Sequence, residues 1–189
     1  MYNDLKNNKP ILVEECIVQH KDMSSLNETS VNTIRVVTLK KKNGDVVVLF
    51  VGLRMGNKGK SVDNFNNDGL FTVVSEDGII RKPAVDKKGN VYETHPATGT
   101  KIIGFKIPNF EAALNVAKEC AKEIEGLRYI GFDVVVTQDD ALILEANPFP
   151  GHDLYQSEVH LEKDLKGLKE KFDKEISVSY THLRAHETD

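Results

Sequence analysis

Three oxygen-bearing side chains, those of Asp133, Glu145 and Asn147, have the types and the spacing to hold a divalent cation. Glu145 and Asn147 are two residues apart, so in extended backbone they point to the same face. Ligand sets made only of oxygen favour Mg²⁺ or Mn²⁺, whereas zinc would want His or Cys. Because Mg²⁺ is usually held by one or two protein carboxylates, with substrate phosphates and water completing its octahedron, such a site also implies a nucleotide.

The chain around these residues has the pattern of a β-hairpin. Two apolar runs, 131–136 and 141–146, flank a polar turn. If Thr137 and Ala141 close the loop, the aspartate lies directly opposite the glutamate. Alternation then points four apolar side chains into a core: Phe132, Val134, Leu142 and Leu144. Like charges opposed across a sheet repel, so the pair needs a cation, unless the hairpin simply has an acidic face in solvent.

The hairpin ends in a proline-rich turn, NPFPG, at residues 147–151. Two prolines fix φ and Gly151 frees it, giving a rigid turn whose exposed backbone could offer an N–H group to a substrate oxygen. With the strand that carries Asp133, this turn resembles the metal-binding end of the ATP-grasp superfamily, which includes D-alanine:D-alanine ligase and glutathione synthetase. The signature of that superfamily is an Asp strand followed by Glu-x-Asn-x-x-Pro-Gly.

Within the superfamily, the chain resembles the sugar-transfer-associated ATP-grasp group, which is related to alpha-L-glutamate ligases. The resemblance covers roughly residues 10–160. It rests on the segments ILVEECIVQH, SVNTIRVVTL, LRMGNKGKSVDNF and IGFDVVV with LEANPFPG. The expected fold is therefore α+β: the C-terminal subdomain of an ATP-grasp domain, mainly an antiparallel sheet packed against helices, with the N-terminal lobe missing.

The resemblance also implies ligand contacts. The three oxygen ligands are expected to hold the Mg²⁺ ions that bridge the phosphates of ATP. A strand over 11–17 would meet the adenine, mostly through its backbone, and this places Glu14 and Glu15 at the nucleotide. As an alternative, both glutamates are exposed charges that guard an edge strand.

Arginines are the candidates for contacting phosphate. D-alanine:D-alanine ligase has an arginine two residues before its metal-binding aspartate, where this chain has Gly131. Arg35 is the best substitute, because in a strand it shares a face with apolar residues, where a guanidinium needs an anion. A phosphate and a structural carboxylate would both fit. By resemblance, Arg54 and Asn64, from the Gly-, Lys- and Asn-rich loop 54–69, are also expected at the site.

For the intact protein, the resemblance implies an ATP- and Mg²⁺-dependent ligase. A small carboxylate would attack the γ-phosphorus, and an amine or sugar-linked acceptor would displace phosphate from the acyl phosphate, in polysaccharide or glutamate-ligase-like modification. Arg35, Arg54 and the Gly151 backbone are the expected catalytic groups, acting by positioning and electrostatics. Two alternatives stay open: a nucleotide- or metal-binding module without catalysis, and a structural sheet with an acidic patch.

Periodicity predicts the remaining elements. Apolar residues recur at helical spacing from Asn109, a favourable N-cap, to Gly126, and that face should cover the metal-bearing sheet. A second amphipathic helix is predicted over 154–176. Between residues 71 and 108, short strands alternate with Asp-Gly and Lys-Gly-Asn turns, which is the pattern of a meander.

Composition is that of a soluble globular domain, with 40% apolar and 29% charged residues. A formal net charge of -4 argues against nucleic acid as a partner. No apolar run is long enough to span a membrane and the polar start is no signal peptide, so a cytoplasmic location is expected. Cys16 and Cys120 form no disulfide framework and are expected to be small buried thiols.

Both ends suggest a piece of a longer protein. Residues 177–188, SVSYTHLRAHET, resemble the translation of a sequencing adapter, so 177–189 is interpreted as a non-native tail. Residues 1–176 are then the C-terminal portion of an ATP-grasp domain. The family places a lobe with lysines and a Gly-rich hairpin ahead of the strand that meets adenine, so the fragment is not expected to turn over ATP by itself.

Overall fold

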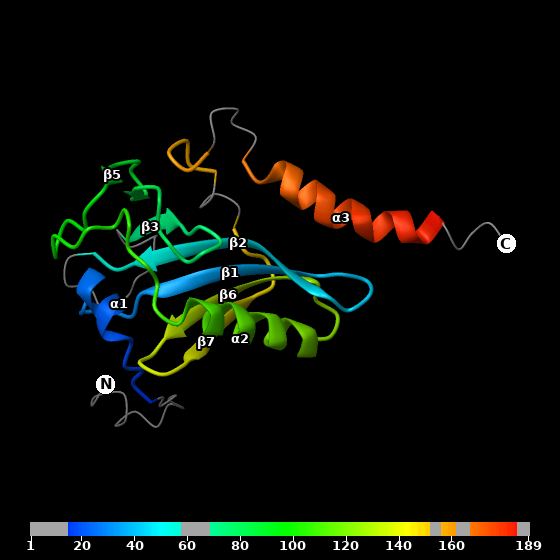
Figure 1. Cartoon of the computed structure of the whole chain (residues 1–189), viewed down its shortest axis with the longest axis horizontal. Coiled ribbons are helices and arrows are strands. Elements are labelled where there is room, and N and C mark those ends of the chain that lie inside the picture. The colour runs from blue at the N-terminus through cyan, green and yellow to red at the C-terminus, as the bar shows by residue number, and fades with distance from the viewer. Residues whose placement is uncertain (1–14, 58–68, 152–155, 162–166, 185–189) are drawn as a thin grey trace, which may run out of the picture.

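A seven-stranded antiparallel sheet with helices packed on both faces forms the body of the protein (Figure 1). The computed structural model describes residues 15–57, 69–151, 156–161 and 167–184. The elements in chain order are α1 (Lys21–Leu26), β1 (Thr33–Lys40), β2 (Val46–Met55), β3 (Leu70–Val73), β4 (Ala84–Val85), β5 (Val91–Tyr92), α2 (Phe110–Glu123), β6 (Tyr129–Val136), β7 (Ala141–Asn147) and α3 (Lys169–Arg184). This arrangement confirms the predicted α+β class.

The strand order is β5-β4-β3-β2-β1-β6-β7, and neighbouring strands run antiparallel. β1 lies between β2 and β6, so residues 33–40 and 129–136 pair although they are far apart in the sequence. The consecutive pairing of β3, β4 and β5 confirms the predicted meander. As a result, side chains from β2, β1 and β6 can meet on one face of the sheet.

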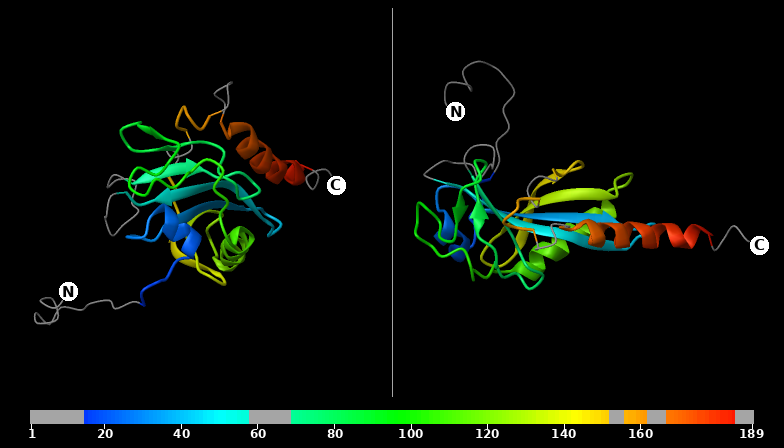
Figure 2. Two further views of the ribbon diagram at one scale, coloured as in Figure 1. Left: turned by 60° about the vertical axis from the view of Figure 1, so that its left-hand side comes forward. Right: turned by 90° about the horizontal axis from the view of Figure 1, so that it is seen from above.

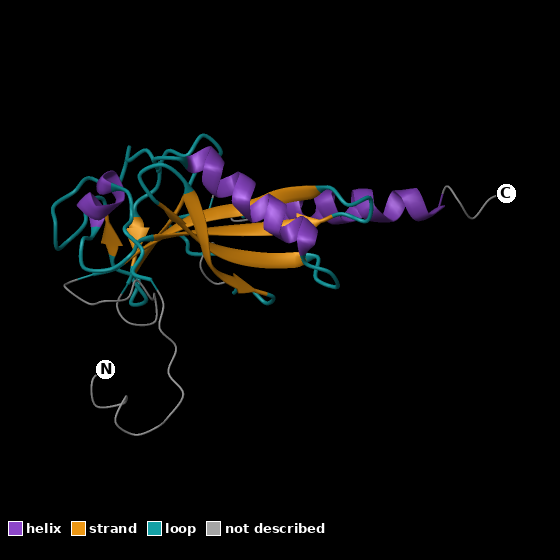
Figure 3. Ribbon diagram, turned by 90° about the horizontal axis from the view of Figure 1, so that it is seen from below, coloured by secondary structure: helices purple, strands orange, loops and turns teal. Residues whose placement is uncertain are grey.

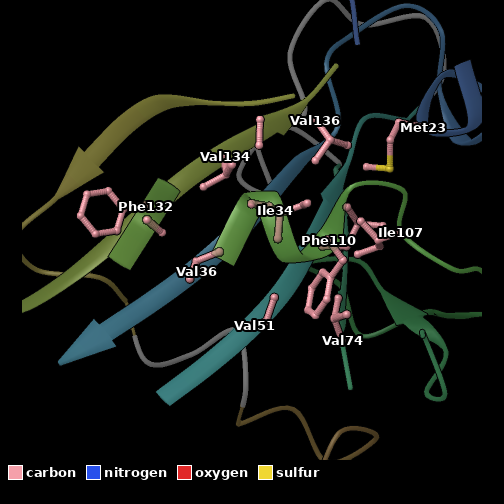
Figure 4. Close-up of a cluster of buried hydrophobic side chains, with 14 of the residues drawn as sticks. Met23, Ile34, Val36, Val51, Val74, Ile107, Phe110, Phe132, Val134 and Val136 are labelled. Atoms are coloured by element: carbon pink, nitrogen blue, oxygen red, sulfur yellow. The ribbon is translucent and has the colours of Figure 1, made fainter. Parts of the chain in front are cut away.

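Helix α2 covers one face of the sheet (Figure 3). Its buried residues recur at intervals of three or four along the helix: Phe110, Ala113, Ala117 and Ala121. The core beneath it contains Met23, Ile34, Val36, Val51, Val74, Ile107, Phe132, Val134 and Val136 (Figure 4). Because alternate residues of β1 and β6 belong to this core, the residues between them, among them Arg35 and Asp133, point to the opposite face. α2 therefore covers the sheet as predicted, but it lies on the face opposite to the one that carries Asp133.

A smaller apolar cluster lies on the opposite face and consists of Val37, Phe50 and Phe71 with Val73, Tyr129, Leu168 and Phe172. The ring of Phe172, on α3, meets that of Tyr129 edge-on with centroids 6.3 Å apart. A salt bridge of 2.6 Å from Lys41 Nζ to Glu175 Oε2 ties α3 to the end of β1. α2 and α3 therefore lie on opposite sides of the sheet, as the left-hand view in Figure 2 shows.

The β6–β7 hairpin differs from the prediction in its loop. Val136 pairs with Ala141, so the loop is one residue longer than predicted. A bulge that leaves Leu144 without a partner on β6 then restores the register, and the predicted aspartate–glutamate pair is confirmed. The offset turns Leu142 to the other face, because a slip of one residue inverts the alternation. Leu142 and Leu144 are 44% and 54% exposed, so their predicted place in the core is wrong.

Asn109 precedes α2 as predicted, but its side chain does not cap the helix. The residue has left-handed backbone, with φ of 48°. Its Nδ2 donates instead to the carbonyl oxygens of Thr137, at 3.0 Å, and Gln138, at 3.2 Å. Asn109 thus ties the start of α2 to the turn of the β6–β7 hairpin.

The second predicted helix is displaced along the chain. It was expected over 154–176, whereas α3 begins at Lys169 and continues to Arg184, across the predicted boundary at 176. Gly167, two residues before α3, has a φ of 57°, which right-handed helical backbone does not include. Neither α3 nor any other helix in the described part of the chain is long and apolar enough to cross a bilayer.

The start of the described chain also differs from the prediction. Residues 15–17 are irregular backbone and not part of a strand. Cys16 is exposed, because no strand carries it into the sheet, and Cys120 is only partly buried. The prediction of two buried thiols is therefore wrong for Cys16.

Candidate functional site

Arg35 and Asp133 form a buried, two-pronged ion pair across the β1–β6 ladder. They lie directly opposite each other in the antiparallel register, so their side chains share a face. Arg35 Nε donates to Asp133 Oδ1 at 2.5 Å, and Nη2 donates to Oδ2 at 3.0 Å. The planar fork of a guanidinium matches a carboxylate in this geometry. Of the two anions predicted to suit Arg35, the structure provides the carboxylate.

Arg54 is a second cation on the same carboxylate. Its Nη1 donates to Asp133 Oδ2 at 2.7 Å, although β1 lies between their two strands. The side chains of Arg35, Asp133 and Arg54 are 11%, 5% and 12% exposed. We call these three residues the Arg–Asp cluster; two positive charges and one negative give it a net charge of +1. Arg54 Nε is buried and has no hydrogen-bond partner among the described residues, which leaves a donor for one more acceptor.

Glu145 and Asn147 lie beside the Arg–Asp cluster on β7. Glu145 pairs with Asp133 and Asn147 pairs with Gly131, so both side chains share the face of the cluster. Glu145 is exposed and Asn147 is half-buried. The Oδ1 atom of Asn147 accepts a hydrogen bond from Phe149 N at 2.9 Å. The structure thus places Asp133, Glu145 and Asn147 with Arg35 and Arg54 on one face of the sheet.

The repulsion between the two opposed carboxylates is compensated by arginine. Asp133 and Glu145 need a cation to offset their repulsion, and Arg35 and Arg54 supply positive charge at Asp133 from inside the fold. A carboxylate offers about four lone-pair positions. Three of those on Asp133 receive arginine N–H groups, and one position remains on Oδ1. An acidic pair by itself is therefore no proof of a metal site in this fold.

The donor set nevertheless fits Mg²⁺. Glu145 has no hydrogen bond or ion pair with the described residues, so its carboxylate is open to a ligand. Glu145 pairs with Asp133, whose Oδ1 atom keeps one unoccupied lone-pair position. Asn147 lies two residues further along the same strand. All three groups offer oxygen, which suits Mg²⁺ or Mn²⁺. The described residues contain no group of three or more His, Cys, Asp or Glu side chains that could hold a metal, so water and phosphate would complete the coordination.

Arg35 lies beside Gly131 of the neighbouring strand. A Cβ atom at residue 131 would lie 3.4 Å from Arg35 Nη1. The guanidinium therefore stands beside the position from which a side chain at 131 would extend.

The other predicted site residues have mixed outcomes. Gly151 is exposed at the end of the turn that follows β7. Glu15 is exposed and is not part of a strand. Glu14 and Asn64 lie outside the residues that the structure describes.

Two further residues of interest had no individual role predicted from the sequence. Pro150 is buried against Gly131 in an otherwise exposed turn; the doubled proline was its only local signal. His95 is buried, and its Nε2 lies 2.8 Å from the carbonyl oxygen of Gly56, at the base of the loop predicted to approach the nucleotide. A lone histidine in a loop gives no sequence signal for such a contact.

A cavity of about 530 Å³ lies away from this cluster. It follows β2 from Val48 to Val51 and reaches Phe110, His160 and Leu168. Its lining is mostly apolar and includes neither arginine of the cluster. The charged residues of its lining are Glu76, Arg81, Lys82 and Lys171, and none of them belongs to the Arg–Asp cluster.

Comparison with known proteins agrees with an ATP-grasp fold. The model of the family described as sugar-transfer associated ATP-grasp matches residues 1–172. The chain therefore belongs to the sugar-transfer associated ATP-grasp family. No curated protein and no solved structure matches the chain. Membership in this family suggests ATP-dependent, ligase-like activity.

Proposed function

We propose that the protein acts as an ATP- and Mg²⁺-dependent ligase that joins a small carboxylate to an amine or a sugar-linked acceptor. The observation that carries this proposal is the juxtaposition of the open Glu145 carboxylate with the Arg–Asp cluster. Glu145 is open to ligands, whereas its neighbour Asp133 is held by two arginines. One face of the sheet thus offers oxygen ligands for a metal and fixed positive charge for phosphate.

In this proposal Glu145 and Asn147 hold Mg²⁺, and Asp133 contributes its remaining Oδ1 position. Bound Mg²⁺ would neutralise charge on the ATP phosphates and help to align them. Glu14, Glu15 and Asn64 are proposed nucleotide contacts on the resemblance alone. The acceptor class, and a role in polysaccharide or glutamate-ligase-like modification, rest on the family as well.

Arg35 and Arg54 are proposed to steady the transferring phosphoryl group. Asp133 holds both guanidiniums at fixed positions, so little reorganisation is needed when negative charge develops nearby. The net charge of +1 and the unsatisfied Nε of Arg54 leave capacity for an anion. A single carboxylate between two arginines therefore supports recognition of a further anion better than a closed one-to-one pair would.

The proposed reaction has two steps. A substrate carboxylate oxygen attacks the γ-phosphorus, the bond from phosphorus to the bridging oxygen of ADP breaks, and an acyl phosphate forms. The acceptor amine then attacks the acyl carbon, and phosphate leaves with the C–O bond electrons while the amine loses a proton. The backbone N–H of Gly151, exposed at the end of the turn, is proposed to polarise the acyl oxygen.

A thermal melt with and without Mg²⁺ and ATP tests the binding part of the proposal. A ligand that binds only the folded state raises its stability by about 2.7 kcal/mol at a concentration of 100 times Kd. We expect Mg²⁺ with ATP to raise the Tm of the wild type and to leave the Tm of Glu145→Gln unchanged. Glu123→Gln, at the end of α2 on the far face of the sheet, is the matched control and should respond like the wild type.

Release of ADP and phosphate tests the catalytic part. A Glu145→Gln variant of the full-length protein that consumes ATP at the normal rate would contradict the proposal. A second candidate function, a binding module without catalysis, is favoured by one observation: three of the four lone-pair positions on Asp133 are occupied by arginine. That module would show the Tm increase without release of ADP, and a purely structural sheet would show neither.

A further inference from the structure

Pro150 is a buried residue in an exposed turn. Phe149 before it is 86% exposed, and Gly151 after it is exposed as well. From Leu144 to Phe149 the chain is exposed or half-buried throughout. Pro150 is therefore the point at which the turn after β7 is anchored to the body of the protein.

The anchor contact is with Gly131 on β6. A Cβ atom built at Gly131 would lie 2.6 Å from Cβ of Pro150 and 3.3 Å from its Cγ. Gly131 is not among the glycines with positive φ, so its backbone conformation does not require glycine. Space requires it, because the proline ring occupies the place of a side chain at 131.

The turn geometry explains how the ring arrives there. Asn147 pairs with Gly131 across the ladder. Phe149 N donates to Asn147 Oδ1 at 2.9 Å, which is an Asx turn at the bend immediately after β7. The residue that follows the bend, Pro150, then lies over the strand partner of Asn147. The fixed φ of proline limits the ways in which this segment can rearrange.

The guanidinium of Arg35 lies beside the same glycine. The Cβ position at Gly131 is 3.4 Å from Arg35 Nη1, an ordinary van der Waals separation, whereas it is 2.6 Å from Cβ of Pro150. A methyl group at 131 would therefore displace the turn and not the arginine. Gly131 thus sets the position of the turn next to the Arg–Asp cluster.

We propose that Pro150, seated on Gly131, is a positioning residue that holds the turn Asn147–Gly151 against the Arg–Asp cluster. The contact fixes the Asn147 carboxamide and the Gly151 N–H group relative to Arg35 and Asp133. The identity of the ligand in this inference rests on the proposed function. The placement of the turn does not, because it follows from contacts within the chain.

A tryptophan reporter tests the placement of the turn without any ligand. The chain contains no Trp, so Phe149→Trp gives a single fluorophore at an exposed position of the turn. In that background we expect Gly131→Ala to change the emission and anisotropy of the new tryptophan. Pro150→Gly removes the ring, so Gly131→Ala should have much less effect on the same signals when it is added to Pro150→Gly. Leu142→Ala, on the same strand but outside the turn, is the control and should leave both signals unchanged.

Titration with Mg²⁺ and ATP then tests the consequence for the site. Loss of a group that orients a metal ligand typically costs about 10- to 100-fold in metal affinity, and we expect Gly131→Ala to weaken binding by that factor. An unchanged tryptophan signal in Gly131→Ala, or equal effects of that substitution with and without Pro150, would overturn the inference. If the signals couple as expected but the wild type binds no Mg²⁺ with ATP, the proposed function fails and the positioning contact stands.

Discussion

Asp133 and Glu145 lie directly opposite each other across the β6–β7 ladder, yet their surroundings are opposite in kind. Both oxygens of Asp133 accept hydrogen bonds from arginine, and the side chain is 5% exposed. Glu145 is exposed and has no polar partner among the described residues. Two adjacent carboxylates can therefore have separate tasks, one in holding the fold and the other in meeting a ligand.

Asp133→Ala should destabilise the protein severely. The substitution leaves the guanidiniums of Arg35 and Arg54 buried without their anion, and removing one partner of a buried pair costs about 3–5 kcal/mol. Urea denaturation of wild type and variant measures the loss of unfolding free energy. A loss below about 1 kcal/mol, the range of exposed ion pairs, would mean that the cluster does not stabilise the fold.

Glu145→Gln should leave stability nearly unchanged. The side chain is exposed, and surface substitutions away from special contacts usually stay within about 0.5 kcal/mol. In the same denaturation experiment Glu145→Gln is the matched counterpart of Asp133→Ala, because Glu145 pairs directly with Asp133 across the ladder. A large loss of stability in Glu145→Gln would show that this carboxylate is structural. A missing Tm increase with Mg²⁺ and ATP in that variant could then not be assigned to lost binding.

The opposed carboxylates could be predicted from the sequence because the signal is local. Side-chain alternation has a period of two in any strand, so the hairpin and the shared face of Asp133 and Glu145 follow from short-range spacing. The face of α2 follows in the same way from helical spacing. Even here the loop was one residue too short in the prediction, and the bulge at Leu144 compensated for it. Leu142, on the turn side of the bulge, was consequently assigned to the wrong face.

The partner of Arg35 could not be predicted, because the contact is not local. Arg35 and Asp133 are 98 residues apart, and their meeting depends on the pairing of β1 with β6. Sequence pattern alone shows that a guanidinium on a buried face needs an anion, but not which anion it meets. The start of α3 is similar: amphipathic spacing before residue 169 suggested helix, whereas α3 begins at Lys169, two residues after Gly167 with its positive φ.

Asn109 should be more sensitive to alanine than to glycine. Both substitutions remove the hydrogen bonds to the carbonyls of Thr137 and Gln138. Only alanine also meets the penalty for left-handed backbone, about 1–2 kcal/mol for an L-residue, at a φ of 48°. We expect Asn109→Ala to lower the unfolding free energy by about 1 kcal/mol more than Asn109→Gly, measured by urea denaturation. Equal losses would mean that the side-chain bonds, and not the backbone conformation, account for the choice of asparagine.

His95 should make the stability depend on pH in the weakly acidic range. Burial lowers the pKa of the His95 imidazole from its ordinary 6.5, although a hydrogen bond to the carbonyl of Gly56 opposes the shift. Since the folded pKa is the lower one, the unfolded chain binds the proton first as pH falls. The contribution of His95 is therefore complete above about pH 6.5 and is lost as pH falls through the folded pKa. Gln at this position keeps an N–H donor for Gly56 but cannot titrate, so unfolding free energies from about pH 7 to about pH 5 should fall less steeply in His95→Gln than in the wild type. Parallel curves for the two proteins would show that another group causes the acid dependence.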